Sequence, residues 1–188
     1  LAMGIKTLGD ISSRTPAELE LWLGNYGADL WKRAQGIHNG EVVPYHEAKS
    51  VSTENTFDAN KTSIDFLHSE LVRMTERVAF ELRQDNKMAG CIAVKIRYSD
   101  FETTSKQTTI PYTFYDDELI PVAKDLFGKL YRQGQPVRLI GVRLSELTNE
   151  AFQTNLFENT EKKAGLYKAI DAVKGRFGKS AIVRGGTI

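Results

Sequence analysis

The chain has 188 residues, of which 41% are hydrophobic and 26% are charged, and its formal net charge is +1. This hydrophobic fraction suffices for a folded core, and the near-zero charge gives no overall indication of a nucleic-acid-binding protein. A single cysteine, Cys91, excludes an intrachain disulfide framework and any CxxC metal or redox motif. No apolar run is long enough to cross a bilayer and no signal-peptide pattern is present, so we expect a cytoplasmic protein with no membrane partner.

Residues 1–40 have the pattern of short helices, and they begin so abruptly that we interpret the chain as part of a longer one. Thr15 and Pro16 suit the N-cap and the first position of a helix. We expect Gly24 and Gly27 to end that helix and residues 28–34 to form another. The helical periodicity is then lost, and we assign residues 41–48 to a linker.

Residues 49–148 alternate between strand and helix patterns. The expected order is a strand at 50–57, a helix at 63–86 broken by Gly90, strands at 91–98 and 103–112, a helix at 118–131 and a strand at 137–144. This β-α-β-β-α-β order predicts an α+β fold, namely a two-layer sandwich in which two helices cover one face of a four-stranded sheet.

The charges of residues 49–148 cancel overall but are unevenly distributed. The segments 62–86 and 116–133, which contain the expected helices, carry a net charge of −3, and the rest of this region carries +3. The uncovered face of the sheet should therefore be basic, and the strands are also rich in serine and threonine. Such side chains contact nucleic-acid phosphates, but they also occur as ordinary solvated strand residues, and both readings stay open. The lack of interleaved aromatic residues favours contacts with the backbone over base stacking.

Residues 149–188 begin without a clear pattern and then become helical. An apolar stripe predicts a helix at 162–177, which Gly178 should end, and residues 181–184 have the composition of a short strand.

Five segments carry a family resemblance, and they occur in the family's order. They are GIKTLGDI (4–11), KSVSTENTF (49–57), KIRYSDF (95–101), TSKQT (104–108) and VRLIGVRL (137–144). Together they resemble the thumb and little-finger domains of the Y-family, or translesion, DNA polymerases, in the DNA polymerase IV (ImpB/MucB/SamB) branch. The resemblance assigns residues 1–40 to the thumb, 49–148 to the little finger and 149–188 to a clamp-binding motif with a helical tail.

The resemblance implies the DNA-binding C-terminal part of a low-fidelity DNA polymerase. Such an enzyme uses Mg²⁺ ions held by carboxylates of a palm domain, and no segment of this chain resembles the palm. We therefore expect no catalytic residues, no metal site and no polymerase activity in this chain alone. The acidic pair Asp116 and Asp117 is better explained as the start of a helix, where the helix dipole stabilises negative charge.

The family's little finger contacts the backbones of template and primer. Carried over by position, the DNA-binding residues would be Ser50, Ser52, Thr53, Lys95, Arg97, Thr104, Ser105, Lys106, Arg138, Gly141 and Arg143. Arginine forks suit phosphate oxygens, and Gly141 lacks a side chain where a backbone must approach closely.

The pentapeptide QTNLF at 153–157 resembles the motif by which bacterial polymerases bind the sliding clamp. Gln153 would form amide hydrogen bonds, and Leu156 and Phe157 would enter an apolar pocket. Thr154 stands where the motif usually has leucine. The alternative is that this segment is an ordinary linker whose two apolar residues pack against the preceding domain.

A different class of protein remains as an alternative. The same elements fit a stand-alone α+β module that binds a protein or RNA and has no connection with a polymerase.

Overall fold

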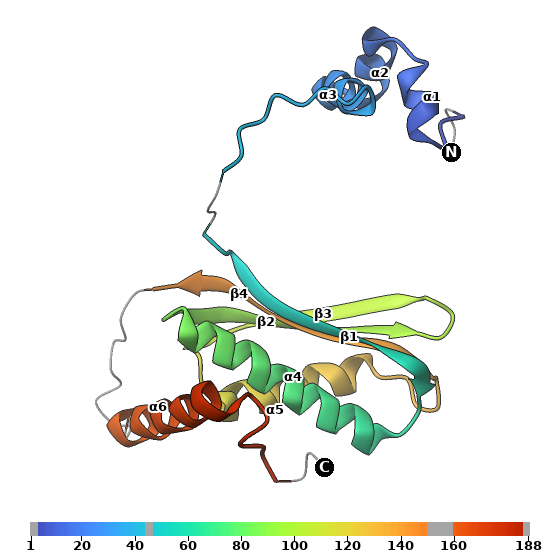
Figure 1. Cartoon of the computed structure of the whole chain (residues 1–188). Helices are drawn as coiled ribbons and strands as arrows, with labels where there is room; N and C mark the ends of the chain where they lie inside the picture. Colours follow the sequence, from blue (N-terminus) through green and yellow to red (C-terminus); the bar gives the residue numbers. More distant parts are fainter. Residues whose placement is uncertain (1–3, 44–46, 150–159, 186–188) are drawn as a thin grey trace. The chain divides into compact units, whose positions relative to one another are not determined.

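The structure, a computed structural model, describes residues 4–43, 47–149 and 160–185 of the chain (Figure 1). The chain divides into two compact units, residues 1–46 (unit 1) and residues 47–188 (unit 2). The functional roles that the sequence assigns to these segments stay predictions.

Unit 1 contains three short helices, α1 (Leu8–Ser12), α2 (Pro16–Leu23) and α3 (Asn25–Ala34). Capping boxes start the first two: Thr7 and Thr15 accept from the backbone three residues ahead, and Asp10 and Glu18 reach back to the cap. The indole nitrogen of Trp31 donates to the carbonyl oxygen of Arg14 at 2.8 Å and so joins α3 to the α1–α2 turn.

The prediction that Gly27 helps to end a helix is wrong, because this glycine lies inside α3. A Cβ atom at this position would lie 2.1 Å from the carbonyl oxygen of Leu19. Gly27 therefore allows α3 to pack closely on α2, over a Leu19 side chain that is completely buried.

Unit 2 is built on a four-stranded antiparallel sheet with the strand order β1-β4-β2-β3. The strands are β1 (Ser50–Lys61), β2 (Met88–Tyr98), β3 (Thr103–Thr113) and β4 (Val137–Thr148), and the helices between them are α4 (Ile64–Gln84) and α5 (Asp116–Leu130). Both helices lie on the same face of the sheet (Figure 1). The predicted α+β sandwich is confirmed, and β1 and β3 form the edges of its sheet.

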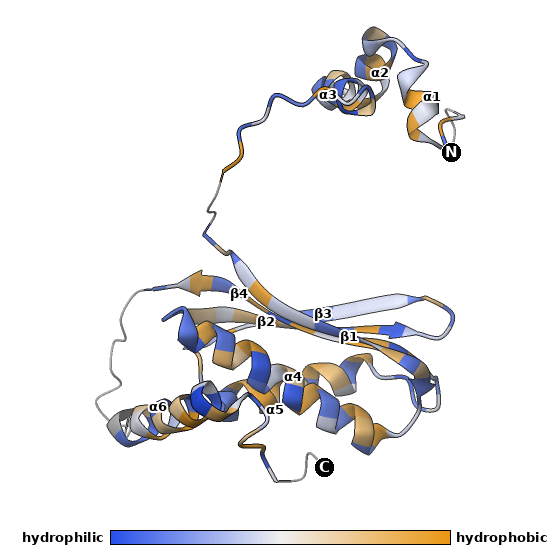
Figure 2. Cartoon of the chain, viewed as in Figure 1, coloured by the Kyte–Doolittle hydropathy of each residue, from blue (hydrophilic) through white to orange (hydrophobic). Residues whose placement is uncertain are grey.

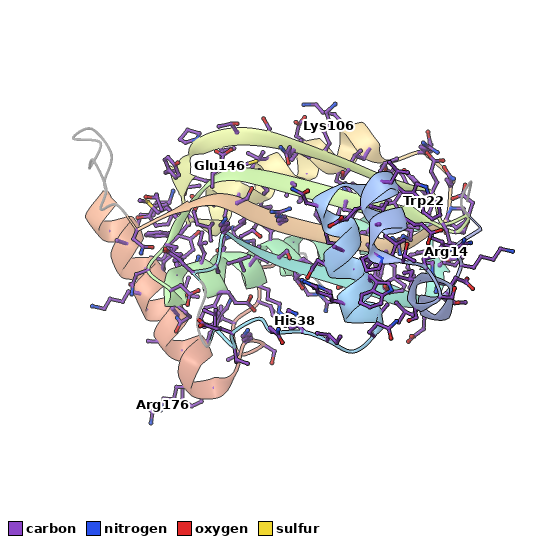
Figure 3. The ribbon with its side chains drawn as sticks, turned by 90° about the horizontal axis from the view of Figure 1, so that it is seen from above. Arg14, Trp22, His38, Lys106, Glu146 and Arg176 are labelled. Atoms are coloured by element: carbon purple, nitrogen blue, oxygen red, sulfur yellow. The ribbon has the colours of Figure 1, made fainter. Side chains whose placement is uncertain are left out.

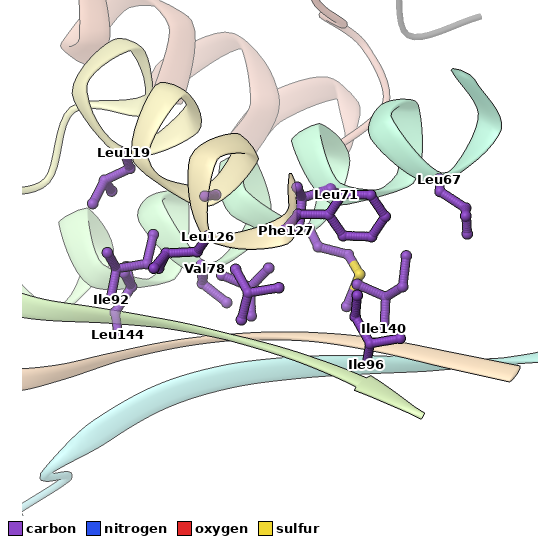
Figure 4. Packing of buried hydrophobic residues seen from close by; sticks show 14 of the residues in the cluster. Leu67, Leu71, Val78, Ile92, Ile96, Leu119, Leu126, Phe127, Ile140 and Leu144 are labelled. Carbon is purple, nitrogen blue, oxygen red and sulfur yellow. The ribbon is translucent and has the colours of Figure 1, made fainter. Parts of the chain in front are cut away.

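The core lies between these helices and the sheet, as Figure 4 shows from close by. Leu71 and Val78 of α4 and Phe127 of α5 contribute from the helical layer, and Ile96 and Ile140 from the strands. All five are completely buried. Their spacing follows from the periods of 3.6 in a helix and 2 in a strand, which the sequence already displays.

Gly90 does not break the first long helix, contrary to the sequence-based prediction. The helix ends at Gln84, and Asn86 in the left-handed region (φ 52°) turns the chain into β2. Gly90 lies within β2, where a Cβ atom would approach the Tyr112 ring to 2.8 Å.

The helix α6 (Thr160–Phe177) follows the sheet in the sequence and ends before Gly178, as predicted. Residues 181–184 do not form a strand, which corrects the prediction. Ile182 and Val183 line a hollow with Glu76 and Phe80 of α4, and none of the strands in the described ranges pairs with them. Figure 2 shows that α6 carries mixed polar and apolar residues, whereas β3 is pale along most of its length because it is rich in threonine. None of the helices in the described ranges combines the length and apolarity that a membrane span requires.

Candidate nucleic-acid interface

The sheet face opposite α4 and α5 (the open face) is organised in rows that cross the strands. Residues that are directly paired in an antiparallel sheet have side chains on the same face. Around the middle of the sheet the pairing gives three rows: Ser52–Arg143–Ala93–Gln107, Glu54–Gly141–Lys95–Ser105 and Thr56–Leu139–Arg97–Thr103. The side chains in these rows are predominantly hydroxyl-bearing, amide or charged.

The structure brings seven of the eleven predicted DNA-binding residues onto this face. They are Ser50, Ser52, Lys95, Arg97, Ser105, Gly141 and Arg143. They come from all four strands, so no one segment of the sequence makes the surface. Their arrangement depends on the register between strands.

Three predicted residues lie on the helix-facing side of the sheet. Thr53 pairs with Val142, Lys106 with Val94 and Thr104 with Ile96, and these partners belong to the core. Lys106 is exposed because β3 is an edge strand, and it lies at the margin of the sheet in Figure 3. The sequence could have shown which predicted residues share a face, because successive side chains of a strand, such as those of Ser105 and Lys106, point to opposite faces of the sheet.

Arg138 lies where the register between β2 and β4 shifts, after Arg97–Leu139 and before Tyr98–Val137. Its guanidinium group lies 4.9 Å from the centre of the Phe101 ring. Phe101 is 64% exposed and has a φ of 67°, in the left-handed region. An exposed aromatic side chain with a stacked arginine thus stands at the end of the sheet, a feature that the sequence did not reveal.

The turn that carries Phe101 is held by one ion pair and one further hydrogen bond. Arg132 binds both carboxylate oxygens of Glu102, at 2.6 and 2.5 Å, and Gln135 donates to Asp100 at 3.2 Å. The hydrogen bonds from Arg132 lower the pKa of the Glu102 carboxyl group. The turn between β2 and β3 is therefore tied to the segment that precedes β4.

The three cations in these rows have different surroundings. Lys95 Nζ lies 2.6 Å from Glu54 Oε1, and Arg97 Nε donates to Thr103 Oγ1 at 2.8 Å. Arg143 is exposed and forms no ion pair with any residue of the described ranges. Glu54 is an acidic residue of these rows that sequence reasoning overlooked, although its position two residues after Ser52 placed it on the same side.

The acidic pair at the start of α5 has two different environments. Asp116 is buried and accepts from Arg83 at 2.7 Å, and its burial raises its pKa despite this partner. Asp117 accepts from the hydroxyl group of Tyr167, in α6, at 2.6 Å. Burial opposes ionisation of Asp117, but hydrogen bonds from Tyr167 and Lys163 lower its pKa overall. The pair serves contacts within unit 2.

In the parts of the chain that the structure describes, no three His, Cys, Asp or Glu side chains gather as a metal centre would require. The described residues therefore do not fit the Mg²⁺ expected for a parent polymerase. The predicted clamp-binding residues Gln153, Leu156 and Phe157 lie outside the described residues.

Comparison with known proteins gives one consistent result. Residues 48–156 match the model of the impB/mucB/samB family C-terminal domain. A protein named DNA polymerase IV from Desulfatibacillum aliphaticivorans is 30% identical over 188 residues, which cover 97% of this chain and 48% of that protein. Proteins of the same name from Methanoculleus marisnigri and Lactococcus lactis subsp. lactis are 38% and 33% identical over 144 and 147 residues, or 77% of this chain and 40% of each protein. The chain thus spans about half the length of the curated relatives it matches.

Proposed function

This chain belongs to the impB/mucB/samB family, because residues 48–156 match that family's C-terminal domain. We propose that the chain is the DNA-holding C-terminal region of a translesion DNA polymerase. The proposed ligand is template–primer DNA, contacted through its phosphates and without sequence preference. The proposed parent enzyme is a low-fidelity, cytoplasmic nucleotidyltransferase whose Mg²⁺ ions are bound outside the residues described above. By itself, this chain should incorporate no nucleotides.

The observation that carries the proposal is the composition of the open face. Seven side chains or backbone positions from four strands gather there, and they include Lys95, Arg97 and Arg143. Lysine, arginine and hydroxyl groups supply most protein contacts with DNA phosphates, and such contacts carry no sequence information. A polymerase that moves along any template requires binding of this kind.

The proposal is tested by replacing Arg143, which has a solvated guanidinium group on this face. Arg143→Ala should weaken binding of a fluorescein-labelled duplex to the same extent for unrelated sequences, and should reduce the slope of log K against log salt by about one unit. The measurement is fluorescence anisotropy at several salt concentrations, starting at low salt.

Arg77→Ala is the matched control, because Arg77 is an exposed arginine on α4, in the helical layer. It should leave the salt slope unchanged. A slope that Arg143→Ala does not alter, or that Arg77→Ala alters equally, would contradict the proposed face. Tighter binding of an RNA duplex than of a DNA duplex would favour the alternative of an RNA-binding module.

We also propose that residues 153–157 bind the bacterial sliding clamp. The support is the sequence QTNLF, in which Gln153 can form amide hydrogen bonds and Leu156 and Phe157 can fill an apolar pocket. A peptide of residues 150–160 should displace a labelled clamp-binding peptide from purified clamp. A peptide with alanine in place of Leu156 and Phe157 is the control. If both peptides compete equally, or if neither competes, the assignment is wrong.

A further inference from the structure

The space above Gly141 on the open face is occupied by a side chain from the neighbouring strand. A Cβ atom at Gly141 would lie 2.9 Å from Glu54 Cγ and 3.4 Å from its Cδ. Glu54 pairs with Gly141 across the β1–β4 ladder, and Gly141 pairs with Lys95 across the β4–β2 ladder. The Glu54 side chain therefore crosses β4 over the glycine and reaches Lys95 on the far side.

At its end, Glu54 Oε1 lies 2.6 Å from Lys95 Nζ. The Glu54 side chain is 46% exposed and the Lys95 side chain 32%, so water and ions reach the pair. An exposed ion pair of this kind contributes little to the free energy of folding, because solvent screens the attraction and both side chains lose conformational entropy. It can therefore exchange readily with an external anion.

A DNA phosphate has the same chemistry as the carboxylate that now occupies this position. Both are oxyanions that accept hydrogen bonds from an ammonium group. Arg143 lies two residues further along β4 on the same face, about 7 Å away along the strand. The glycine, the lysine and this arginine together provide the close backbone approach and the positive charge that a phosphate requires.

We propose that Glu54 is an intramolecular competitor for a DNA phosphate at the position between Gly141 and Lys95. In the free protein its carboxylate neutralises Lys95 and covers Gly141. When DNA binds, the phosphate takes the place of the carboxylate, and Glu54 must move off the glycine. The residue thereby lowers the affinity for DNA without contributing a favourable contact of its own. This inference rests on the proposed DNA-binding function of the open face.

The test is Glu54→Gln, which keeps the size and shape of the side chain, removes its charge and replaces one acceptor oxygen by an NH2 donor. We expect duplex DNA to bind about three- to tenfold more tightly at low salt, because Lys95 is freed and a repulsion is removed. Asp125→Asn is the matched control: Asp125 forms an exposed pair with Lys129 on α5, in the helical layer, and the charge change is the same. It should raise the affinity much less.

A double-mutant cycle identifies the route by which Glu54 acts. In a Lys95→Ala background, Glu54→Gln should improve binding no more than Asp125→Asn does, because the ammonium group for which the carboxylate and the phosphate compete is gone. An equal gain with and without Lys95, or a gain in the parent chain no larger than that of the control, would overturn the competitor role.

The same experiment separates this inference from the function on which it rests. If the parent chain binds DNA and Arg143→Ala weakens binding while Glu54→Gln has no effect, the open face stands and the competitor role fails. If neither the parent chain nor Glu54→Gln binds DNA at low salt, the proposed function itself fails. Circular dichroism of each variant at the assay temperature shows whether the fold is retained.

Discussion

Arg83 is the residue at which three segments of unit 2 meet. Its Nη1 atom donates to Asp116 and to the carbonyl oxygen of Phe114, both at 2.7 Å, and Nε and Nη2 donate to Asp171 at 2.7 and 3.0 Å. Its side chain is only 6% exposed. A buried charge must be paired and hydrogen-bonded, and here one guanidinium group serves α4, α5 and α6 together.

We expect Arg83→Met to lower the free energy of unfolding by about 3–5 kcal/mol, because it leaves the carboxylate of Asp116 buried without its partner. Urea unfolding followed by circular dichroism measures the change. The second replacement in Arg83→Met/Asp116→Asn should restore part of the loss, since it removes the uncompensated charge. A single variant that loses less than about 1 kcal/mol would show that the network has no such role.

At the scale of elements, α6 is held on the rest of unit 2 mainly through one face that mixes aromatic and charged residues. Tyr167 is buried, its ring lies 5.1 Å from that of Tyr115, and Arg83 stacks on it at 4.8 Å. Burial, together with the hydrogen bond that its hydroxyl group donates to Asp117, raises the pKa of Tyr167 to about 12. Lys163, also in α6, forms ion pairs with Asp117 and Glu118 of α5.

The contact between Tyr167 and Asp117 predicts a pH dependence of stability. The pKa of Asp117 is lower in the folded chain than its ordinary value of 3.8, so its contribution is complete above that pH and is lost as the pH falls through the folded value. Asp116 has the opposite effect: its pKa is raised in the folded chain, so the ionisation of this group at higher pH lowers the stability. We expect Asp117→Asn to be less stable than the parent chain at pH 7, by at most about 1 kcal/mol because the group is partly exposed.

The difference between the parent chain and Asp117→Asn should begin to shrink as the pH falls below 3.8, where Asp117 of the unfolded chain takes up a proton. It should vanish below the lower pKa of the folded chain, where Asp117 is uncharged in both states. Urea unfolding of both chains at pH 7, 5 and 3 provides the comparison, and Asp116 contributes equally to both. A difference that stays constant down to pH 3 would show that the charge of Asp117 is not involved.

For the whole molecule, the two units differ greatly in the size of their cores. Unit 1 buries Ile11 and Leu19, whereas the main cluster of unit 2 extends from Phe57 to Leu144 and joins both layers of the sandwich. Small units bury too little surface for high stability. We therefore expect unit 1 to unfold at a lower urea concentration than unit 2.

The chain contains its own probe for this prediction, because both of its tryptophans, Trp22 and Trp31, lie in unit 1. Tryptophan fluorescence should report the earlier transition, and circular dichroism, to which the sheet and the long helices contribute most, the later one. Residues 47–188 alone should keep the midpoint of the later transition. Coincident transitions by both probes, or a lower midpoint after truncation, would show that the units unfold together.

Much of the local structure was predictable because its causes lie close together in the sequence. Alternation from Ile92 to Tyr98 predicts a strand with one buried face, and the capping residue Thr15 with Pro16 predicts the start of α2. The sequence did not predict the role of a glycine where several roles were possible. Gly27 and Gly90 were expected to interrupt helices, but one allows two helices to approach and the other lies in a strand.

The sequence by itself determined the strands and long helices of the sandwich, their order and the family, since each depends on residue types at fixed spacing. The tertiary structure decided which predicted residues share a surface: Ser52 and Arg143 are paired, whereas Lys106 lies on the other side of the sheet from Ser105. It also placed Glu54 over Gly141 and joined Arg83 to Asp171, which are 88 residues apart. Strand register and long-range ion pairs arise only when distant segments pack, because no local pattern specifies which residues will be opposite one another.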